Sequence, residues 1–374
     1  MFWSRDSPLL RSPRLSGMEL KPLNMKYHQF SLAVLCLALY GCGTKDSRQN
    51  EIDTDFEMTL PYTVSIDITK AVPMDEALSH HKYISFTEDV ENIMGFPRNM
   101  VVSGDTIFAV ASRPSPGIFA YLKTGEQLFA YCSEGSGPGD INSPSCISVT
   151  DNEISTYDDS SFKTVVIGKD GKYRRSIEAP IMALNAIIDA KGNLWADFTN
   201  QEYDTVRVSC KFRSDTTYHT VMNVPELQKG MTQIELEALQ TLPDGTVGYT
   251  PSYEPRIYTL SDGCAAVRYE LDFNGLWPDD KTFKENFTGN DWAPKTNRFP
   301  VQNLRFHESD RYLVVGFKNM KQPYLHILDK TSGNGVTLRL NQDDYYSSSY
   351  VTDSELYLGR KDDRVEIMKI KEIE

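Results

Sequence analysis

From residue 97 onward, short runs of alternating apolar and polar residues are separated by polar turns, and one unit recurs six times. Each unit opens with an apolar run, continues through alternating runs and ends after an Asp-Gly or Lys-Gly type of turn. Alternation with a period of two is typical of β-strands, because successive side chains point to opposite faces of a sheet. The pattern therefore predicts an all-β chain. The units begin near Met100, Cys146, Ala186, Leu239, Asn303 and Tyr350.

The spacing of the units indicates how the strands are grouped. Equivalent positions lie 46, 40, 52, 65 and 46 residues apart, and they are Val101, Ile147, Ile187, Leu239, Leu304 and Tyr350. Steps of this size with about four short strands each are typical of propeller blades. We therefore predict a six-bladed β-propeller with four-stranded blades over residues 58–374. A sandwich, or two separate β domains, is the competing interpretation, and the regular Asp-x-x-Gly turns favour the propeller.

Closure of the ring requires a strand from outside the repeats. The last unit is short, whereas the strand-like runs 59–67 and 83–87 precede the first unit and have no partner in it. An unpaired sheet edge is avoided if one of these runs supplies the missing strand of the last blade. The two longest steps predict insertions at 230–239 and 274–297.

The N-terminal residues predict the cellular location of the protein rather than a folded element. Residues 1–24 show no apolar periodicity and are interpreted as an over-long gene start, with Met25 as the better initiator. Residues 25–41 contain Lys26 and an apolar run over 30–39, which suits a secretory signal and is too short to span a membrane. The sequence Leu-Tyr-Gly-Cys ending at Cys42 resembles a bacterial lipobox, in which the cysteine is lipidated. An ordinary cleaved signal with an incidental cysteine is the alternative.

The segment after Cys42 is interpreted as a flexible tether over residues 42–57, because it is too polar to bury a core. Gly43 stands where an aspartate would mark inner-membrane retention in some bacteria. We therefore expect a lipid anchor in the outer membrane, on its periplasmic or its cell-surface side, as the only contact with the membrane.

Charge narrows the choice of partners. The chain has 39 basic and 52 acidic residues, of which residues 1–41 hold five and two, so a chain beginning at Cys42 has a net charge of −16. Such an acidic chain is poorly suited to neutralising phosphates, which argues against a nucleic-acid partner. The charge favours solubility and attracts cations. We expect a monomer.

Cysteine usage leaves the redox state open. Cys132 and Cys146 flank a glycine-rich loop and could form a disulfide at its base, since envelope compartments permit disulfides. The alternative is that these two cysteines, together with Cys210 and Cys264, are thiols. The spacing shows no Cys-x-x-Cys motif and no zinc-finger pattern.

The glycine-rich loop itself is the sequence Glu-Gly-Ser-Gly-Pro-Gly-Asp over residues 134–140. Three glycines and a proline exclude a helix or a strand interior. A phosphate-binding role is disfavoured because the lysine and helix that follow such loops are missing. We predict that the loop connects the outer strand of the first blade to the inner strand of the second.

Two groups of residues are candidates for a functional site. Asp158 and Asp159, beside Glu134 or Asp140, have the oxygen ligands that Ca²⁺ prefers, although solvated turn caps are the alternative. No other cofactor is expected. A second group lies at comparable strand ends and could line one mouth of the central channel, although blade packing or solvation is again the alternative. This ligand-binding group comprises Arg113, Tyr157, Trp195, Tyr249 and Lys318, together with Asp158 and Asp159 of the first group.

With these motifs in hand, the chain resembles the six-bladed TolB-like or NHL-like β-propeller lipoproteins of Gram-negative envelopes. The resemblance is carried by residues 64–70, 81–86, 123–126 and the Gly-Pro-Gly loop at 134–140, and it covers about residues 60–374. Ile141 and the Ser133-Glu134 pair depart from the family pattern, in which an aromatic and a basic residue are usual. The resemblance implies the fold and the cellular location of the protein more than a reaction or a ligand.

The leading hypothesis is a non-enzymatic, envelope-anchored propeller that binds a protein, peptide or glycan at one face. Its support is the lipobox, the rigid repeat and the lack of a Gly-x-Ser-x-Gly or His-Glu-x-x-His motif. A metal-dependent lactonase or lyase is the alternative, because related propellers hold a metal in the channel. A passive assembly factor of an envelope complex is the second alternative.

Lipidation has a direct test. Replacing Cys42 by alanine removes the sulfur that would carry the lipid, so Cys42→Ala should move the protein from the membrane fraction to the soluble fraction. Partitioning that does not change would show that the anchor lies elsewhere.

Overall fold

The computed structural model divides the chain into Met1–Asp53 and Thr54–Glu374, and the second unit holds the β-structure. The structure describes residues 60–86, 91–179, 183–198, 206–228, 237–251, 254–281, 301–341, 346–360 and 364–373. The predicted gene start, signal, Cys42 and tether lie outside the described residues. So do most of the predicted insertions at 230–239 and 274–297. No helix within the described residues is long and apolar enough to cross a membrane.

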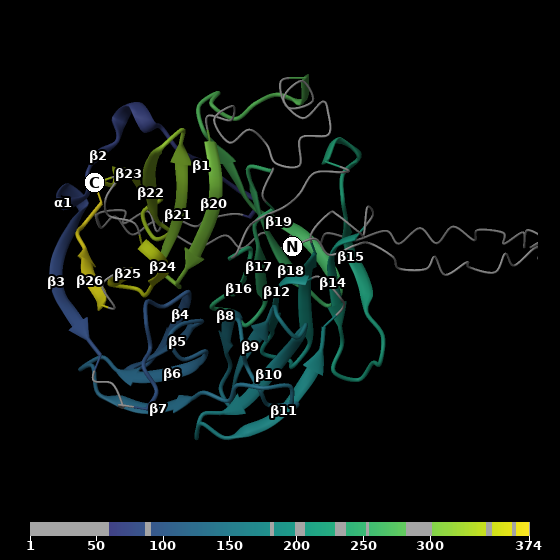
Figure 1. Ribbon diagram of the computed structural model, residues 1–374. Coiled ribbons are helices and arrows are strands. Elements are labelled where there is room, and N and C mark those ends of the chain that lie inside the picture. The colour runs from purple at the N-terminus through teal and green to yellow at the C-terminus, as the bar shows by residue number, and fades with distance from the viewer. Residues whose placement is uncertain are drawn as a thin grey trace, which may run out of the picture. The chain divides into compact units, whose positions relative to one another are not determined.

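Six sheets, each built on four antiparallel strands, make up the structure (Figure 1), which confirms the prediction of a six-bladed propeller. Blade 1 is β4 (Asn99–Ser103), β5 (Thr106–Ala111), β6 (Gly117–Leu122) and β7 (Gln127–Tyr131). Blade 2 is β8 (Pro144–Val149), β9 (Glu153–Asp158), β10 (Lys163–Gly168) and β11 (Tyr173–Glu178). Blade 3 is β12 (Ala183–Ile188), β13 (Leu194–Phe198), β14 (Val206–Lys211) and β15 (His219–Asn223), followed by the 3-10 turn η2 (Glu226–Gln228).

The remaining three blades have the same order. Blade 4 is β16 (Leu239–Thr241), β17 (Val247–Tyr249), β18 (Arg256–Ser261) and β19 (Cys264–Asp272). Blade 5 is β20 (Val301–Glu308), β21 (Tyr312–Asn319), β22 (Gln322–Asp329) and β23 (Gly335–Arg339). Blade 6 is β24 (Tyr346–Val351), β25 (Glu355–Arg360) and β26 (Arg364–Ile370).

The first strand of each blade lies innermost. β8 contacts both β4 and β12, β4 contacts β24, β24 contacts β20, and β12 contacts β16. A shared hydrophobic cluster joins blade 4 to blade 5 through Leu242, Ile257 and Phe306, which completes the ring. Alternation accounts for this arrangement, because each blade has an apolar face toward each neighbour.

The N-terminal residues 62–85 run along the outer edges of three blades, and we call them the N-terminal belt. β1 (Tyr62–Ser65) pairs in parallel with β19 of blade 4, and β2 (Val72–Pro73) pairs in parallel with β23 of blade 5. After the single turn α1 (Met74–Ala77), β3 (Leu78–Ser85) pairs antiparallel with β26 and is the fourth strand of blade 6. Closure by an N-terminal strand is therefore confirmed. The belt also gives blades 4 and 5 a fifth strand, which the repeat pattern does not reveal.

The end of β3 joins blade 6 to blade 1. Ile84 is 2% exposed and belongs to a cluster with Phe119 of blade 1 and Ile367 of blade 6. Lys82 Nζ donates to the carbonyl of Lys123, at 2.9 Å. A Cβ at Gly125 would lie 2.5 Å from the Ser85 carbonyl oxygen, and this residue has φ +95°, so only glycine fits the turn against which β3 packs.

The strand directions place two kinds of connection at opposite ends of the ring. One end, which we call the loop face, carries the links between blades and the connections between second and third strands. The other end, the turn face, carries the hairpins between first and second and between third and fourth strands. The Lys-Gly turn at Gly192 and the Asp-Gly turns at Gly245 and Gly263 lie on the turn face, and the Gly-Pro-Gly loop lies on the loop face.

The seam between blades 6 and 1 can be tested through Ile84. Ile84→Ala removes buried methyl and methylene groups and should lower the free energy of unfolding by about 2–4 kcal/mol. Ser85→Ala is the control, because this neighbouring side chain is exposed and should change stability by less than about 0.5 kcal/mol. Urea denaturation of both variants measures the difference. Equal costs for the two substitutions would contradict a seam closed by β3.

Candidate functional site

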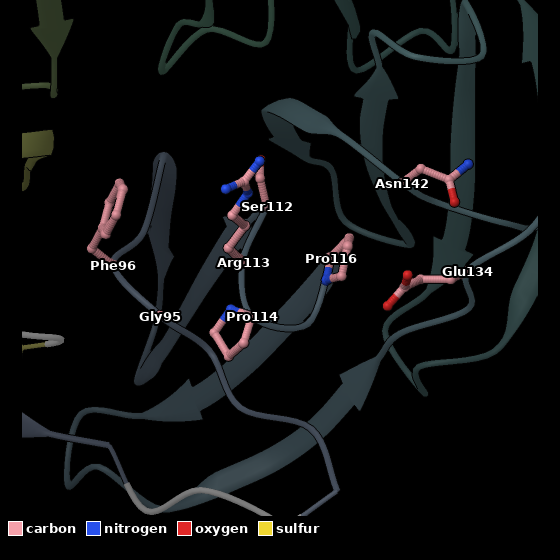
Figure 2. A pocket seen from close by; sticks show the side chains of 8 residues that line it. All are labelled: Gly95, Phe96, Ser112, Arg113, Pro114, Pro116, Glu134 and Asn142. Atoms are coloured by element: carbon pink, nitrogen blue, oxygen red, sulfur yellow. The ribbon is translucent and has the colours of Figure 1, made fainter.

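An open pocket of about 700 Å³ lies on the loop face, where blade 1 meets blade 2 (Figure 2). Three segments form its walls: the link between β3 and β4, the connection between β5 and β6, and the loop between β7 and β8. The lining residues are Gly95, Phe96, Ser112, Arg113, Pro114, Pro116, Glu134 and Asn142. Two of these segments were singled out in the sequence, through Arg113 and through the Gly-Pro-Gly loop.

The connection between β7 and β8, which contains the Gly-Pro-Gly loop at residues 134–140, is folded around Asp140. The Asp140 carboxylate accepts hydrogen bonds from the Gly137 amide at 2.6 Å and from Ser133 Oγ at 2.7 Å. These bonds, that of Ser133 foremost, hold the pKa of Asp140 below its usual range. A Cβ at Gly135 would clash with the same carboxylate, which explains a glycine there. Ile141 is buried in the cluster between blades 1 and 2, so this position anchors the loop.

Asp158 fixes the far end of this loop. It is fully buried at the end of β9 and accepts hydrogen bonds from the amides of Asn142 and Ser143, at 3.1 and 2.9 Å. The hydroxyls of Ser160 and Ser161 also donate to the Asp158 carboxylate, both at 2.7 Å. Burial raises the pKa of Asp158, but these hydrogen bonds outweigh burial and leave it below its usual value.

The same contacts argue against calcium at this position. Both Asp158 oxygens already accept hydrogen bonds from protein groups, so they are not available as ligands. Asp159 is partly exposed and lies 3.9 Å from Arg98 Nη1. Among the described residues, no three His, Cys, Asp or Glu side chains converge as a metal site would require. The residues placed here do not fit the Ca²⁺ expectation.

Arg98 links the walls of the pocket. Its Nη1 donates to Ser112 Oγ at 2.8 Å and to the Pro144 carbonyl at 3.1 Å, and Ser112 Oγ donates to the same carbonyl at 3.2 Å. Asn142 is also engaged, since its side chain exchanges two hydrogen bonds with the backbone of Gly135. The frame of the pocket is therefore held by internal hydrogen bonds.

Three side chains of the pocket take no part in these internal hydrogen bonds and are available to a ligand. Phe96 is 47% exposed, and Arg113 and Glu134 are exposed as well. Neither Arg113 nor Glu134 makes a hydrogen bond or salt bridge with another described residue. In the view of Figure 2, Arg113 stands between Phe96 and Glu134, and the Glu134 carboxylate points toward the Ser112–Pro116 connection. The pocket thus presents an apolar ring, a guanidinium donor and a carboxylate acceptor.

The other predicted ligand-binding residues lie elsewhere. Tyr157 is buried between blades 2 and 3, where its hydroxyl donates to the Ala183 carbonyl at 2.9 Å. Trp195 is fully buried and its Nε1 donates to Asp189 Oδ2 at 2.9 Å, near the turn face. Lys318 lines a cavity of about 30 Å³ together with residues of blades 5 and 6. The structure therefore brings only Arg113 of this group to the pocket, and the aromatic residues serve blade packing.

Tyr249 belongs to a buried polar cluster between blades 3 and 4, which sequence reasoning missed apart from that tyrosine. Its hydroxyl donates to Asp197 Oδ1 at 3.1 Å. Nearby, the fully buried Arg207 donates to Glu254 Oε1 at 2.6 Å and to the side chain of Gln228. The sequence feature that could have revealed this cluster is a charged residue inside each of the apolar strands β13 and β14. Burial raises the pKa of Asp197 to about 7.

The cysteines are thiols in the structure. Cys132, Cys146, Cys210 and Cys264 form no disulfide, so the bridge considered between Cys132 and Cys146 is not formed. Cys146 is buried and donates to the Ala186 carbonyl at 3.2 Å. Burial, with a smaller effect of Glu134, raises the pKa of Cys132 to about 11. Such a shift disfavours the reactive thiolate.

The Asp197 cluster predicts a pH dependence of stability. Because the pKa of Asp197 is about 7 in the folded chain and 3.8 without these surroundings, the folded state binds more protons between these values. The contribution of Asp197 is therefore fullest below about pH 4 and falls as pH rises to about 7. Asp197→Asn should flatten the decline of the melting temperature over this range, whereas Asp159→Asn, at a half-exposed carboxylate, should preserve it. An unchanged slope in Asp197→Asn would contradict the assignment.

Comparison with solved structures shows the same fold in other proteins. A protein from Bacteroides fragilis described as exported is 12% identical, with a TM-score of 0.69 over 83% of this chain and 100% of that chain. A member of the DUF4221 family from Bacteroides vulgatus is 9% identical, with a TM-score of 0.53 over 79% of this chain and 97% of that chain. At such low identity these similarities concern the fold alone.

Sequence comparison identifies the family. No curated protein matches the chain. A family model described as "6-bladed beta-propeller" matches residues 49–355, which is most of the chain and includes all the pocket residues. The chain therefore belongs to the 6-bladed beta-propeller family DUF5128.

Proposed function

We propose that this chain is a lipid-anchored protein of the cell envelope that binds a ligand through the loop-face pocket and catalyses no reaction. The proposed location in the cell envelope is supported by the signal-like residues 25–41, by the lipobox-like sequence ending at Cys42 and by the similarity in fold to an exported protein. Attachment to the outer membrane through the lipid, as a TolB-like or NHL-like lipoprotein, is the form that the sequence favours.

One observation carries the binding function. The pocket has a frame held by its own hydrogen bonds, from Arg98, Asp140 and Asp158, while three exposed side chains at its surface are unengaged. A pre-formed frame lowers the cost of ordering groups on binding, because little conformational freedom remains to be lost. Side chains needed only for stability would be satisfied within the fold, as Asp158 is.

The same site offers little to a hydrolase or lyase. The carboxylates with lowered pKa, Asp140 and Asp158, accept hydrogen bonds from the loop that they hold in place, so their oxygens are committed. Glu134 is the carboxylate that lines the pocket itself, and no histidine is among the residues that line the pocket with it. Binding is therefore favoured over acid–base catalysis.

The proposal is tested by a pocket variant. The full-length lipidated protein in detergent is applied to arrays of glycans and peptides, beside the triple variant Phe96→Ala, Arg113→Ala, Glu134→Gln. The wild type should bind at least one class of ligand, and the triple variant should lose at least about 90% of the signal because all three unengaged groups are removed.

Met320→Ala is the matched control, since Met320 is an exposed apolar residue on the loop face of blade 5. It should bind as the wild type does. Binding that survives in the triple variant would move the site away from this pocket, and a wild type that binds nothing on either array would overturn the proposed function.

A further inference from the structure

The ligand class can be inferred from the groups that the pocket presents, on the basis of the binding function proposed above. Arg113 offers several N–H donors and no acceptor, whereas an ionised Glu134 offers acceptors only. Phe96 adds an apolar ring that is half exposed to solvent. A ligand that satisfies this set must carry acceptors, donors and an apolar face together.

The charges of the pocket do not select a charged ligand. Arg113 and Glu134 are one cation and one anion, so the formal charge of the three unengaged groups is zero. Both are exposed, and exposed ion pairs contribute only about 0–1 kcal/mol because water and salt screen them. The acidic chain as a whole repels polyanions. A neutral ligand fits these conditions best.

The shape of the pocket favours a segment of a polymer over an enclosed small molecule. A volume of about 700 Å³ is within the range of ligand pockets, but the pocket is open to solvent and cannot surround its occupant. An open site on a rigid rim instead admits a chain whose ends extend beyond it. The neutral polymers to be considered are an uncharged glycan and an uncharged peptide.

The walls disfavour a peptide. One recurring way to bind an extended peptide is to add it as a strand to a free sheet edge, which requires a row of backbone N–H and C=O groups. The connection between β5 and β6 contains Pro114 and Pro116, which have no N–H, and its Ser115 amide already donates to the Ile93 carbonyl at 3.4 Å. Pro97 follows Phe96 in the adjacent wall, where Met94 pairs with Pro114. No ladder of backbone hydrogen bonds can form along these segments.

A sugar matches the same walls. Each hydroxyl is both a donor and an acceptor, so one ring can accept from Arg113 and donate to Glu134. The C–H face of a pyranose is apolar and can cover the Phe96 ring, which removes apolar surface from water at about 25 cal/mol per Å². We propose that the loop-face pocket binds a neutral oligosaccharide, with Phe96 as the stacking platform and Arg113 and Glu134 as hydrogen-bonding partners.

The experiment uses uncharged hexose and N-acetylhexosamine oligosaccharides as probes, with the full-length lipidated protein in detergent and calorimetry as the readout. The dissociation constant should change less than about threefold between low salt and about 0.5 M salt, because no net charge is neutralised. Phe96→Ala should weaken binding at least about tenfold, and Phe96→Trp should restore it, since a larger ring preserves the platform.

Each other outcome overturns the assignment. No binding of any neutral oligosaccharide, or affinity that falls steeply with salt, would exclude the neutral glycan. Peptide binding that is lost in Phe96→Ala would exclude the glycan and leave the proposed pocket intact. Glycan binding that is unchanged in both Phe96→Ala and Arg113→Ala would place the sugar outside this pocket and contradict both proposals.

Discussion

The pairing of β3 with β26 is the interaction on which the rest of the structure depends. A blade has two apolar faces, so an open ring would expose one face at each end of the chain of blades. β3 completes blade 6, and its Ile84 packs into the cluster shared with blade 1. The chain then continues from β3 directly into the link that carries Gly95 and Phe96. One wall of the candidate pocket is therefore attached to the strand that closes the ring.

The blades could be predicted from the sequence because their signals are local. Val101, Ile147 and Ile187 all lie in innermost strands, as their spacing indicated, since alternation and turn residues are read within a few positions. The two parallel pairings of the belt could not be predicted. β2 is only two residues long and includes Pro73, and its partner lies more than 260 residues away, so no local pattern marks it.

The candidate site was predictable only in part, for a related reason. Arg113 lies in a turn rich in prolines and serines, where a long charged side chain must face solvent. Tyr157, Trp195 and Tyr249 lie in strands whose two faces are both buried, and alternation alone does not say which neighbouring blade receives a side chain. Phe96 was missed because an aromatic residue between glycine and proline has the same sequence signature whether it is buried or exposed.

Two buried aspartates show how surroundings decide the role of one residue type. Asp158 receives hydrogen bonds from three amides and two hydroxyls, and the pKa of its carboxyl is lowered. Asp197 receives a hydrogen bond from Tyr249, and burial raises its pKa. Asp197 therefore gives the junction of blades 3 and 4 a stability that depends on pH. The loop that shapes the pocket is held by Asp140 and Asp158, which remain ionised well below neutral pH. A change of pH that loosens one side of the ring therefore leaves the frame of the pocket in place.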